Sequence, residues 1–301
     1  MFHEYALDPG VLTSWERVRT FLDAFGPAKG RFLVDLPRKG WKQLVMDAVA
    51  AHGCSALDRS RIEEKLRRVD KRTLLPRKDQ VAPVPGPWVA TARAEHARDP
   101  LRAIITPEPL AGQADEIAPD DCHGDASPWH VPHGCLVPRK ATELSDRCRV
   151  LVRASKRVIL VDPYFNVSRA QVSAVLTPLA RLVAKAGASL EVHARDEKGH
   201  AEALRATQRA LPASVPIGFE VTVRWLAAAT STHRHHNRYL LTEIGGVQLG
   251  DSAEEGDAGH EDRWSILDTD AHERLWKRHT ELGAGFQEAG PACTVRGTRP
   301  G

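Results

Sequence analysis

Hydrophobic positions recur at helical spacing through the first hundred residues. After Asp8-Pro9, a pair typical of a helix start, apolar side chains stand three or four positions apart as far as Phe25. The same spacing predicts three further helices, which begin near Trp41, Leu57 and Trp88. Residues 31–36 are consistent with either a strand or an extended link. We therefore expect residues 1–100 to form a small, mainly helical N-terminal domain.

The next segment, residues 101–141, is rich in proline, glycine, aspartate and alanine, which predicts an irregular linker. Beyond it, short apolar strands alternate with amphipathic helices. The predicted strands are residues 157–161, 189–193, 219–225, 239–242, 247–249 and 262–267, and the predicted helices are residues 144–155, 168–185, 199–210 and 271–282. This order is typical of an α/β domain built from βαβ units, which we place at residues 142–290. Residues 291–301 are expected to be a flexible tail.

One predicted β-hairpin carries residues suited to phosphate chemistry. Its strands are separated by Gly245-Gly246, which are able to take the positive φ angles of a tight turn. Because side chains alternate along a strand, His236 and Arg238 are expected on one face. A nitrogen nucleophile beside a fixed cation suits a phosphate group. Ser252, just after the second strand, is a candidate donor to the same ligand.

Two more candidates follow the first predicted strand of the α/β domain. Asp162 and Tyr164 come directly after residues 157–161. Sheets of this class place ligands outside the carboxyl ends of their strands, so both residues are candidates for substrate binding. The alternative is that Asp162 only caps the turn at Pro163.

The order of these elements resembles one half of the phospholipase D fold, over about residues 142–290. The motif of that family is His-x-Lys, four residues, Asp, and then a Gly-Ser-x-Asn segment. Here His236 matches the histidine, Arg238 stands at the lysine, and Glu243 lies one position beyond the place of the aspartate. Gly250-Asp251-Ser252 matches the Gly-Ser segment only loosely. The chain is also similar to uncharacterised bacterial proteins of this type that are associated with mobile elements and phage defence.

The resemblance implies a mechanism. In the family, one histidine attacks phosphorus and a second protonates the leaving group, without a metal or other cofactor. His236 and Arg238 would then be catalytic, and Tyr239 is a further candidate for substrate binding. A second His-x-Arg run, at residues 193–195, follows a strand that the family does not use. A homodimer in which two copies of His236 meet across a two-fold axis would supply the missing histidine.

Composition adds the expected cellular setting. The chain has 301 residues, a formal net charge of only +3, and five scattered cysteines. An odd, scattered set of cysteines fits reduced thiols, and we expect a cytoplasmic protein. No window has about 18 consecutive apolar residues, and the first ten residues have no basic segment followed by an apolar run. We therefore expect neither a membrane span nor a signal peptide.

Positive charge is concentrated in the helix predicted near residues 57–69 and just beyond it. Within residues 59–78 the candidate nucleic-acid contacts are Arg67, Arg68 and Lys71. The alternative is a solvated helix face on which Glu63 and Glu64 pair with these cations. The helical domain would then serve to bind a partner protein.

Cysteine and histidine cluster in the predicted linker, at Cys122, His123, His130, His133 and Cys135. Such residues are zinc ligands in many proteins, but this spacing contains no Cys-x-x-Cys pair. The segment is therefore interpreted as a polar loop without a metal, with a zinc site as the alternative.

Three hypotheses follow. The first is a phosphodiesterase, in its preferred form a dimeric nuclease that uses His236. The second is an inactive domain of the same fold that binds phosphate, nucleic acid, a protein or a membrane surface. It is favoured by arginine at position 238, because an Arg-for-Lys exchange is not conservative at a tight site. The third is a structural hairpin in a protein whose function lies in the N-terminal domain as an adaptor.

Overall fold

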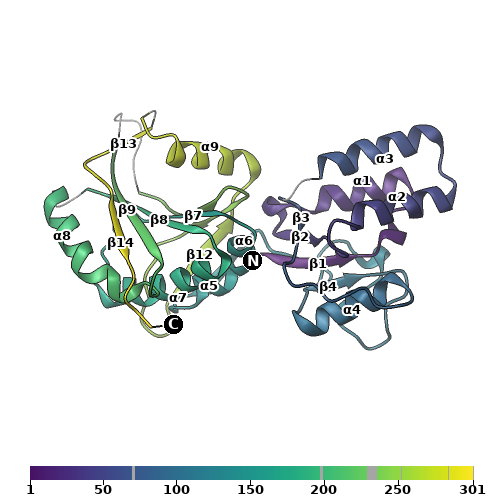
Figure 1. Ribbon diagram of the computed structural model, residues 1–301, viewed down its shortest axis with the longest axis horizontal. Helices are drawn as coiled ribbons and strands as arrows, with labels where there is room; N and C mark the ends of the chain where they lie inside the picture. The colour runs from purple at the N-terminus through teal and green to yellow at the C-terminus, as the bar shows by residue number, and fades with distance from the viewer. Residues whose placement is uncertain (70–71, 197–198, 229–235, 252, 284, 301) are drawn as a thin grey trace. The chain divides into compact units, whose positions relative to one another are not determined.

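The chain folds into two compact units. The computed structural model describes residues 1–301 except 70–71, 197–198, 229–235, 252, 284 and 301 (Figure 1). The first unit is Met1–Pro132 and the second unit is His133–Gly301. The expected linker at residues 101–141 is therefore divided between two folded units, and each part contributes strands to a sheet.

The first unit is built on a parallel sheet, so the expectation of a mainly helical domain is wrong. In the described part of the unit, the strands lie in the order β3-β2-β1-β4-β5 and every neighbouring pair is parallel. The strands are β1 (His3–Leu7), β2 (Arg31–Val34), β3 (Leu74–Leu75), β4 (Ala103–Ile105) and β5 (Glu116–Ile117). Each is two to five residues long. Strands this short, buried on both faces, show no alternation of polar and apolar residues, which is why the pattern did not reveal most of them.

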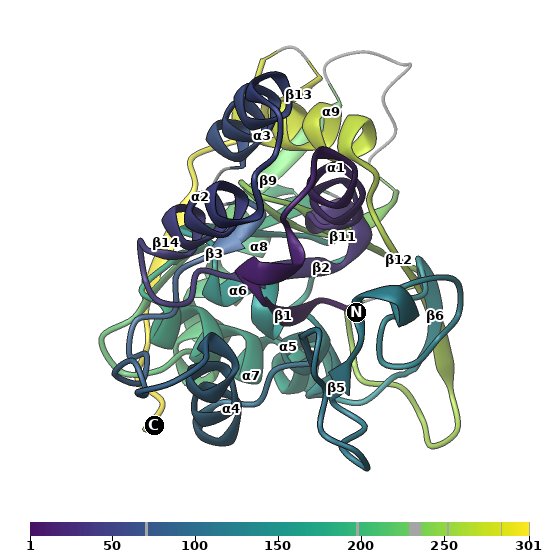
Figure 2. The ribbon, with the colours of Figure 1, turned by 90° about the vertical axis from the view of Figure 1, so that its right-hand side faces the viewer.

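Helices cover both faces of this sheet, and the side-chain alternation of the strands assigns each face. The helices are α1 (Trp15–Ala24), α2 (Trp41–His52), α3 (Ala56–Arg68) and α4 (Trp88–Arg98). Tyr5 and Leu7 pack in the cluster formed with α1, α2 and α3, whereas Ala6 packs with Val89 of α4. Figure 2 shows the first three helices on one side of the strands and α4 on the other.

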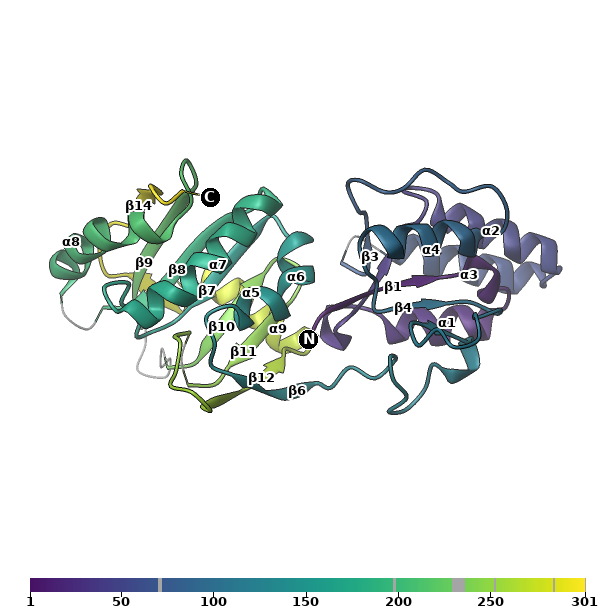
Figure 3. The same ribbon diagram turned by 90° about the horizontal axis from the view of Figure 1, so that it is seen from below.

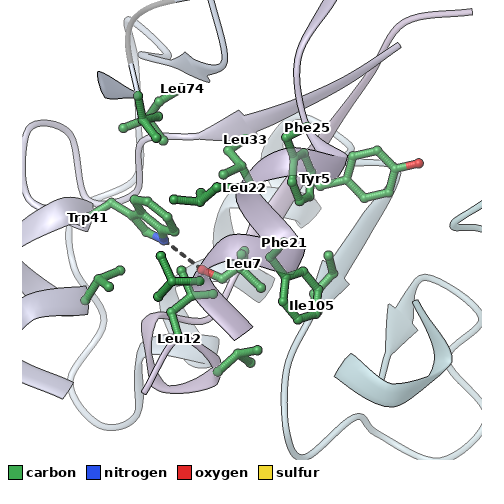
Figure 4. Packing of buried hydrophobic residues seen from close by; sticks show 14 of the residues in the cluster. Tyr5, Leu7, Leu12, Phe21, Leu22, Phe25, Leu33, Trp41, Leu74 and Ile105 are labelled. Atoms are coloured by element: carbon green, nitrogen blue, oxygen red, sulfur yellow. Dashed lines mark hydrogen bonds between the residues drawn. The ribbon is translucent and has the colours of Figure 1, made fainter. Parts of the chain in front are cut away.

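The larger core is fixed by a buried tryptophan. Trp41 is fully buried, and its indole Nε1 donates a hydrogen bond of 2.7 Å to the carbonyl oxygen of Leu7 (Figure 4). Leu12 and Leu22 lie beside the indole in this view, and Tyr5, Phe21 and Phe25 lie farther along the same cluster. This contact ties the start of α2 to the carboxyl end of β1, and it satisfies the polar atom of the tryptophan.

A buried arginine lies between β1 and α4. Arg77 is only 3% exposed, and its guanidinium donates to both carboxylate oxygens of Glu4 and to Glu95. It also donates to the backbone oxygen of Asp99. Arg77 belongs to the positively charged run at residues 59–78, but the structure uses it to hold the first unit together.

The second unit contains a mixed sheet flanked by helices, as the strand and helix pattern predicted. Within the described residues its strands run β13-β9-β8-β7-β10-β11-β12-β6, and β14 also pairs with β9. They are β6 (Gly134–Pro138), β7 (Arg157–Val161), β8 (Ser189–Arg195), β9 (Glu220–Ala228), β10 (Arg238–Thr242), β11 (Gly246–Leu249), β12 (Glu261–Ile266), β13 (Phe286–Glu288) and β14 (Cys293–Arg296). Strands β7, β8 and β9 are parallel to one another, and the remaining pairs are antiparallel.

Two strands of this sheet lie where the sequence indicated irregular chain. Strand β6 comes from the expected linker and pairs with β12 (Figure 3). Strand β14 comes from residues 291–301, the expected flexible tail, and pairs with β9 from Cys293 to Arg296. Strand β6 is held by its pairing with β12, and β14 is held by its pairing with β9. Both partners are distant in sequence, so local sequence alone did not reveal these strands.

The helices of the second unit are α5 (Glu143–Arg147), α6 (Arg149–Arg153), α7 (Ala170–Ala186), α8 (His200–Ala210) and α9 (Thr269–Thr280). Helix α9 packs on the sheet face formed by Ile159, Val161, Tyr239 and Leu241. Figure 1 shows α5 and α7 on the opposite face of that sheet.

Strand directions bring several chain segments together at one end of the central strands of this sheet. Strand β10 runs antiparallel to β7, with Tyr239 paired with Val161, and β11 runs antiparallel to β10. The start of β10 therefore lies beside the carboxyl ends of β7, β8 and β11. At these strand ends lie Asp162, Arg195, Arg238 and Gly250.

The hairpin turn differs in detail from the expectation. In the described hairpin, neither Gly245 nor Gly246 takes a positive φ. The Thr242 hydroxyl instead organises the turn by donating to the carbonyl oxygen of Gly245 and accepting from its N–H. Gly246 is needed for space, because a Cβ there would come within 2.9 Å of Leu241 and Leu267.

Candidate functional site

A hollow of about 600 Å³ opens at these strand ends. It is lined by polar and charged side chains from five segments: Arg139, Asp162, Tyr164, Arg169, His236, Asn237, Arg238, Asp251 and Glu254. The structure therefore brings together four of the candidates identified in the sequence, namely Asp162, Tyr164, His236 and Arg238. Ser252, the fifth candidate from this region, lies outside the described residues, as do His233 and His235.

His236 lies at the exposed rim of the hollow and is held by a tyrosine. Its Nδ1 is 3.0 Å from the hydroxyl oxygen of Tyr164. A hydroxyl both donates and accepts, so this contact supports either neutral tautomer of the ring. When Nδ1 carries the proton and donates to Tyr164, Nε2 keeps its lone pair and is the nucleophilic nitrogen.

Arg238 is fixed by three neighbours. Its Nε is 3.6 Å from Oδ1 of Asp162, which is an ion pair too long for a hydrogen bond. Its Nη1 donates to the carbonyl oxygen of Gly250 at 3.4 Å. Its guanidinium carbon lies 4.9 Å from the centre of the Tyr164 ring, a cation–π distance. The cation therefore stands beside His236 through their shared contact with Tyr164.

Asp162 lies behind Arg238, where it is almost fully buried. Its Oδ1 accepts a hydrogen bond of 3.0 Å from the N–H of Tyr164. Burial raises the pKa of this carboxyl, while that N–H and the charge of Arg238 act in the opposite direction. Asp162 therefore caps the turn, as the alternative interpretation held, and also pairs with Arg238, while its role in substrate binding stays a prediction.

The segment that only loosely resembled a Gly-Ser element is organised by a buried aspartate. The carboxylate of Asp262 accepts hydrogen bonds from the N–H groups of Gly250 and Asp251, each at 3.0 Å. It also accepts from the indole of Trp264 at 2.9 Å. A Cβ at position 250 would come within 1.8 Å of Asp262 Oδ1, so only glycine fits there. This network aims the Gly250 carbonyl at Arg238.

Other charged residues near the hollow were not among the predicted site residues. Glu254 pairs with Arg139 at 3.4 Å and with Arg169 at 2.8 Å. Arg195 adds another cation near the site, since its guanidinium carbon is 4.9 Å from the Tyr164 ring centre. A search of strand ends would have found Arg195. Nothing local distinguishes Arg139 or Glu254, because β12 and its pairing with β6 bring them there.

Two other candidates from this unit lie away from the hollow. Tyr239 is only 9% exposed, packs among the apolar residues under α9, and accepts a hydrogen bond from Asn237. It is a core residue, because alternation points it to the face opposite Arg238. His193 is fully buried, with its Nδ1 3.0 Å from Nδ1 of His279. The second His-x-Arg run therefore supplies no exposed imidazole.

The predicted nucleic-acid contacts on α3 have acidic partners. Arg67 pairs with Glu63 and Glu64, and Arg68 pairs with Glu64, all on the exposed helix surface. These pairs match the interpretation as a solvated helix face. Lys71 lies outside the described residues.

The cysteines and histidines of residues 122–135 are dispersed. Cys122 belongs to the first unit, where its Sγ contacts the carbonyl oxygen of Ala118, whereas Cys135 lies on β6 of the second unit. His130 pairs with Asp125. Among the residues that the structure describes, no three histidine, cysteine or acidic side chains are grouped as metal ligands.

Comparisons with known proteins assign no family. No protein-family model matches the sequence, and no curated protein matches it either. Among solved structures, the chain shows a distant similarity to TrmBL2, an archaeal chromatin protein described with a novel mode of DNA binding. The TM-score is 0.27 and the identity 11%, and the match covers 50% of this chain and about half, 52%, of that one. A similarity at this level carries no argument about fold or function. Across the described residues, none of the helices has the length and apolar character needed to cross a membrane.

Proposed function

We propose that the second unit acts on phosphodiesters, as a metal-independent nuclease of the phospholipase D type with His236 as its nucleophile. The observation that carries the proposal is the contact between Nδ1 of His236 and the Tyr164 hydroxyl, beside a fixed Arg238. A nucleophile oriented by a third group, next to a cation that binds phosphate oxygens, is the arrangement that covalent phosphoryl transfer requires.

Each group has a role in this chemistry. Nε2 of His236 attacks phosphorus, so that a nitrogen–phosphorus bond forms and the bond to the leaving oxygen breaks. Arg238 stabilises the negative charge on the phosphate oxygens, and Asp162 holds Arg238 in place. Water then attacks phosphorus, which releases the product and restores the imidazole. Histidine nucleophiles of this kind need no metal ion.

The leaving oxygen requires a proton, and the described lining of the hollow holds His236 as its one histidine. We propose that His236 of a second copy supplies this proton, and later accepts one from the attacking water, in a two-fold symmetric dimer. The exposure of His236 at the rim is compatible with such a meeting.

A second candidate function is phosphate or nucleic-acid binding without turnover. It is favoured by the way Arg238 is held, since ion pairing with Asp162, a bond to Gly250 and stacking on Tyr164 leave its guanidinium less free than a lysine amine would be. Phosphate binding survives this arrangement better than catalysis does, because the planar fork still matches two phosphate oxygens.

The two functions are separated by one experiment on the full chain. Single- and double-stranded DNA and RNA are incubated with the protein in EDTA, and cleavage and binding are measured in parallel. The nuclease proposal predicts cleavage of at least one substrate in EDTA. Binding without cleavage supports the second candidate, and neither binding nor cleavage contradicts both.

A further inference from the structure

We propose that Arg139 and Arg169 form a second phosphate subsite in the hollow, which the carboxylate of Glu254 occupies until a nucleic-acid strand displaces it. This inference rests on the proposed function of the second unit and specifies its substrate class. The preferred ligand is a single strand with at least two consecutive phosphates, one at His236 and Arg238 and the next at Arg139 and Arg169.

The geometry of the three side chains carries the proposal. The two oxygens of one carboxylate are divided between two arginines, with Oε1 of Glu254 at 3.4 Å from Arg139 and Oε2 at 2.8 Å from Arg169. A phosphodiester also presents two anionic oxygens to guanidinium groups. Glu254 therefore occupies the position, and makes the contacts, that a phosphate would take.

All three side chains line the same hollow as His236 and Arg238. Its volume of about 600 Å³ is within the usual range for ligand sites, roughly 300–1,000 Å³. A compound with a single phosphodiester would engage the His236 and Arg238 end. A longer strand would also reach the pair held by Glu254.

Two backbone hydrogen bonds, made by the two residues that follow Glu254, hold its loop in place. The N–H of Glu255 donates to the carbonyl oxygen of Gln171, and the N–H of Gly256 donates to that of Arg139. The loop is thus tied to the segments that carry the two arginines. Arg169 has a half-exposed side chain, whereas Arg139 and Glu254 are mostly buried. An incoming phosphate can reach Arg169 first, and Glu254 then has to move.

The negative charge of Glu254 lowers the affinity of the hollow for phosphate. The hollow is lined by three arginines and by the three carboxyl groups of Asp162, Asp251 and Glu254. Removing the charge of Glu254 takes away the carboxylate that Arg139 and Arg169 share and increases their attraction for phosphate. Glu254 therefore selects for strands that offer enough phosphates to replace it.

The test compares two probes, a thymidine dinucleotide with a single phosphodiester and a thymidine hexanucleotide, and binding is read before any cleavage product forms. For the wild type we expect the hexanucleotide to bind at least about tenfold more tightly. Arg169→Gln should remove most of that difference and leave dinucleotide binding within about twofold. It should also reduce the slope of log K against log salt by about 0.7, the change for one lost contact to a single strand. Glu254→Gln should tighten hexanucleotide binding about threefold to tenfold.

The matched control is Arg205→Gln, an exposed arginine on α8 that does not line the hollow, which should change neither probe. Equal binding of both probes by the wild type, or unchanged hexanucleotide binding in Arg169→Gln, would overturn the second subsite. Failure of the dinucleotide to bind, in protein that is folded by circular dichroism, would instead contradict the proposed function at His236 and Arg238.

Discussion

Replacing His236 by alanine is expected to abolish cleavage, with kcat for a phosphodiester falling at least about a thousandfold. The reason is the loss of the imidazole that Tyr164 orients beside Arg238. Binding should remain within about threefold, because the phosphate anchor is Arg238 and not the imidazole. The measurement is single-turnover cleavage of a labelled oligonucleotide in EDTA, with affinity determined for the same variant.

Tyr164→Phe is the matched variant for this prediction. It removes the hydroxyl that lies 3.0 Å from Nδ1 but keeps the ring under Arg238, and it should lower kcat about tenfold, the effect of one hydrogen bond. His236→Ala subunits mixed into the wild type test the dimer. Activity should fall as the square of the wild-type fraction if two copies of His236 form one site. A linear fall would contradict the shared site, and full activity of His236→Ala would contradict the nucleophile.

Replacing Arg77 by methionine is expected to destabilise the first unit by about 3–5 kcal/mol. The change leaves the carboxylate of Glu4 buried without its cation and removes one of the two arginines that pair with buried Glu95. The measurement is urea unfolding of the full chain followed by tryptophan fluorescence. The transition that involves Trp41 should shift to lower urea concentration.

The control for this change is Arg67→Met, which also breaks ion pairs with two glutamates, but on the exposed surface of α3. Surface pairs contribute about 0–1 kcal/mol, so this variant should unfold almost like the wild type. Similar effects of the two substitutions would contradict the structural role of Arg77.

The stability that the Arg77 network gives the wild type should depend on pH. Burial alone would raise the pKa of Glu95, but hydrogen bonds from Arg98, the N–H of Val81 and Arg77 outweigh it and lower that pKa. A carboxyl whose pKa is lower in the folded state stabilises the fold above its unfolded pKa. That stability is lost as the pH falls through the folded pKa, so the advantage of the wild type over Arg77→Met should shrink in acid.

The hairpin shows what local pattern is able to predict. A short apolar run at residues 239–242 and the glycine pair after it located β10 and β11 within one residue. The pairing of β10 with β7, which brings the basic end of β10 beside Asp162, was not predicted and comes from the structure. The strands of the first unit escaped this reasoning, because β3 and β5 are two residues long and are stabilised by neighbours distant in sequence.

The site shows the same limit. His236, Arg238, Asp162 and Tyr164 were identified because each lies next to a recognisable strand end. Arg139 and Glu254 were not, since the first lies in the expected linker and the second lies between two predicted strands, beyond the end of the hairpin. Tyr239 was chosen for its nearness to Arg238 in sequence, although successive residues of a strand point to opposite faces.

If His236 is the nucleophile, its covalent phosphorus intermediate can be trapped. The wild type is mixed with an oligonucleotide in EDTA, quenched rapidly at alkaline pH to preserve a nitrogen–phosphorus bond, digested and examined by mass spectrometry. We expect a nucleotide joined through phosphorus to the peptide that contains His236, and no such adduct in His236→Ala. Cleavage with an adduct on a different residue, or single-turnover cleavage with no adduct at any time, would contradict this expectation.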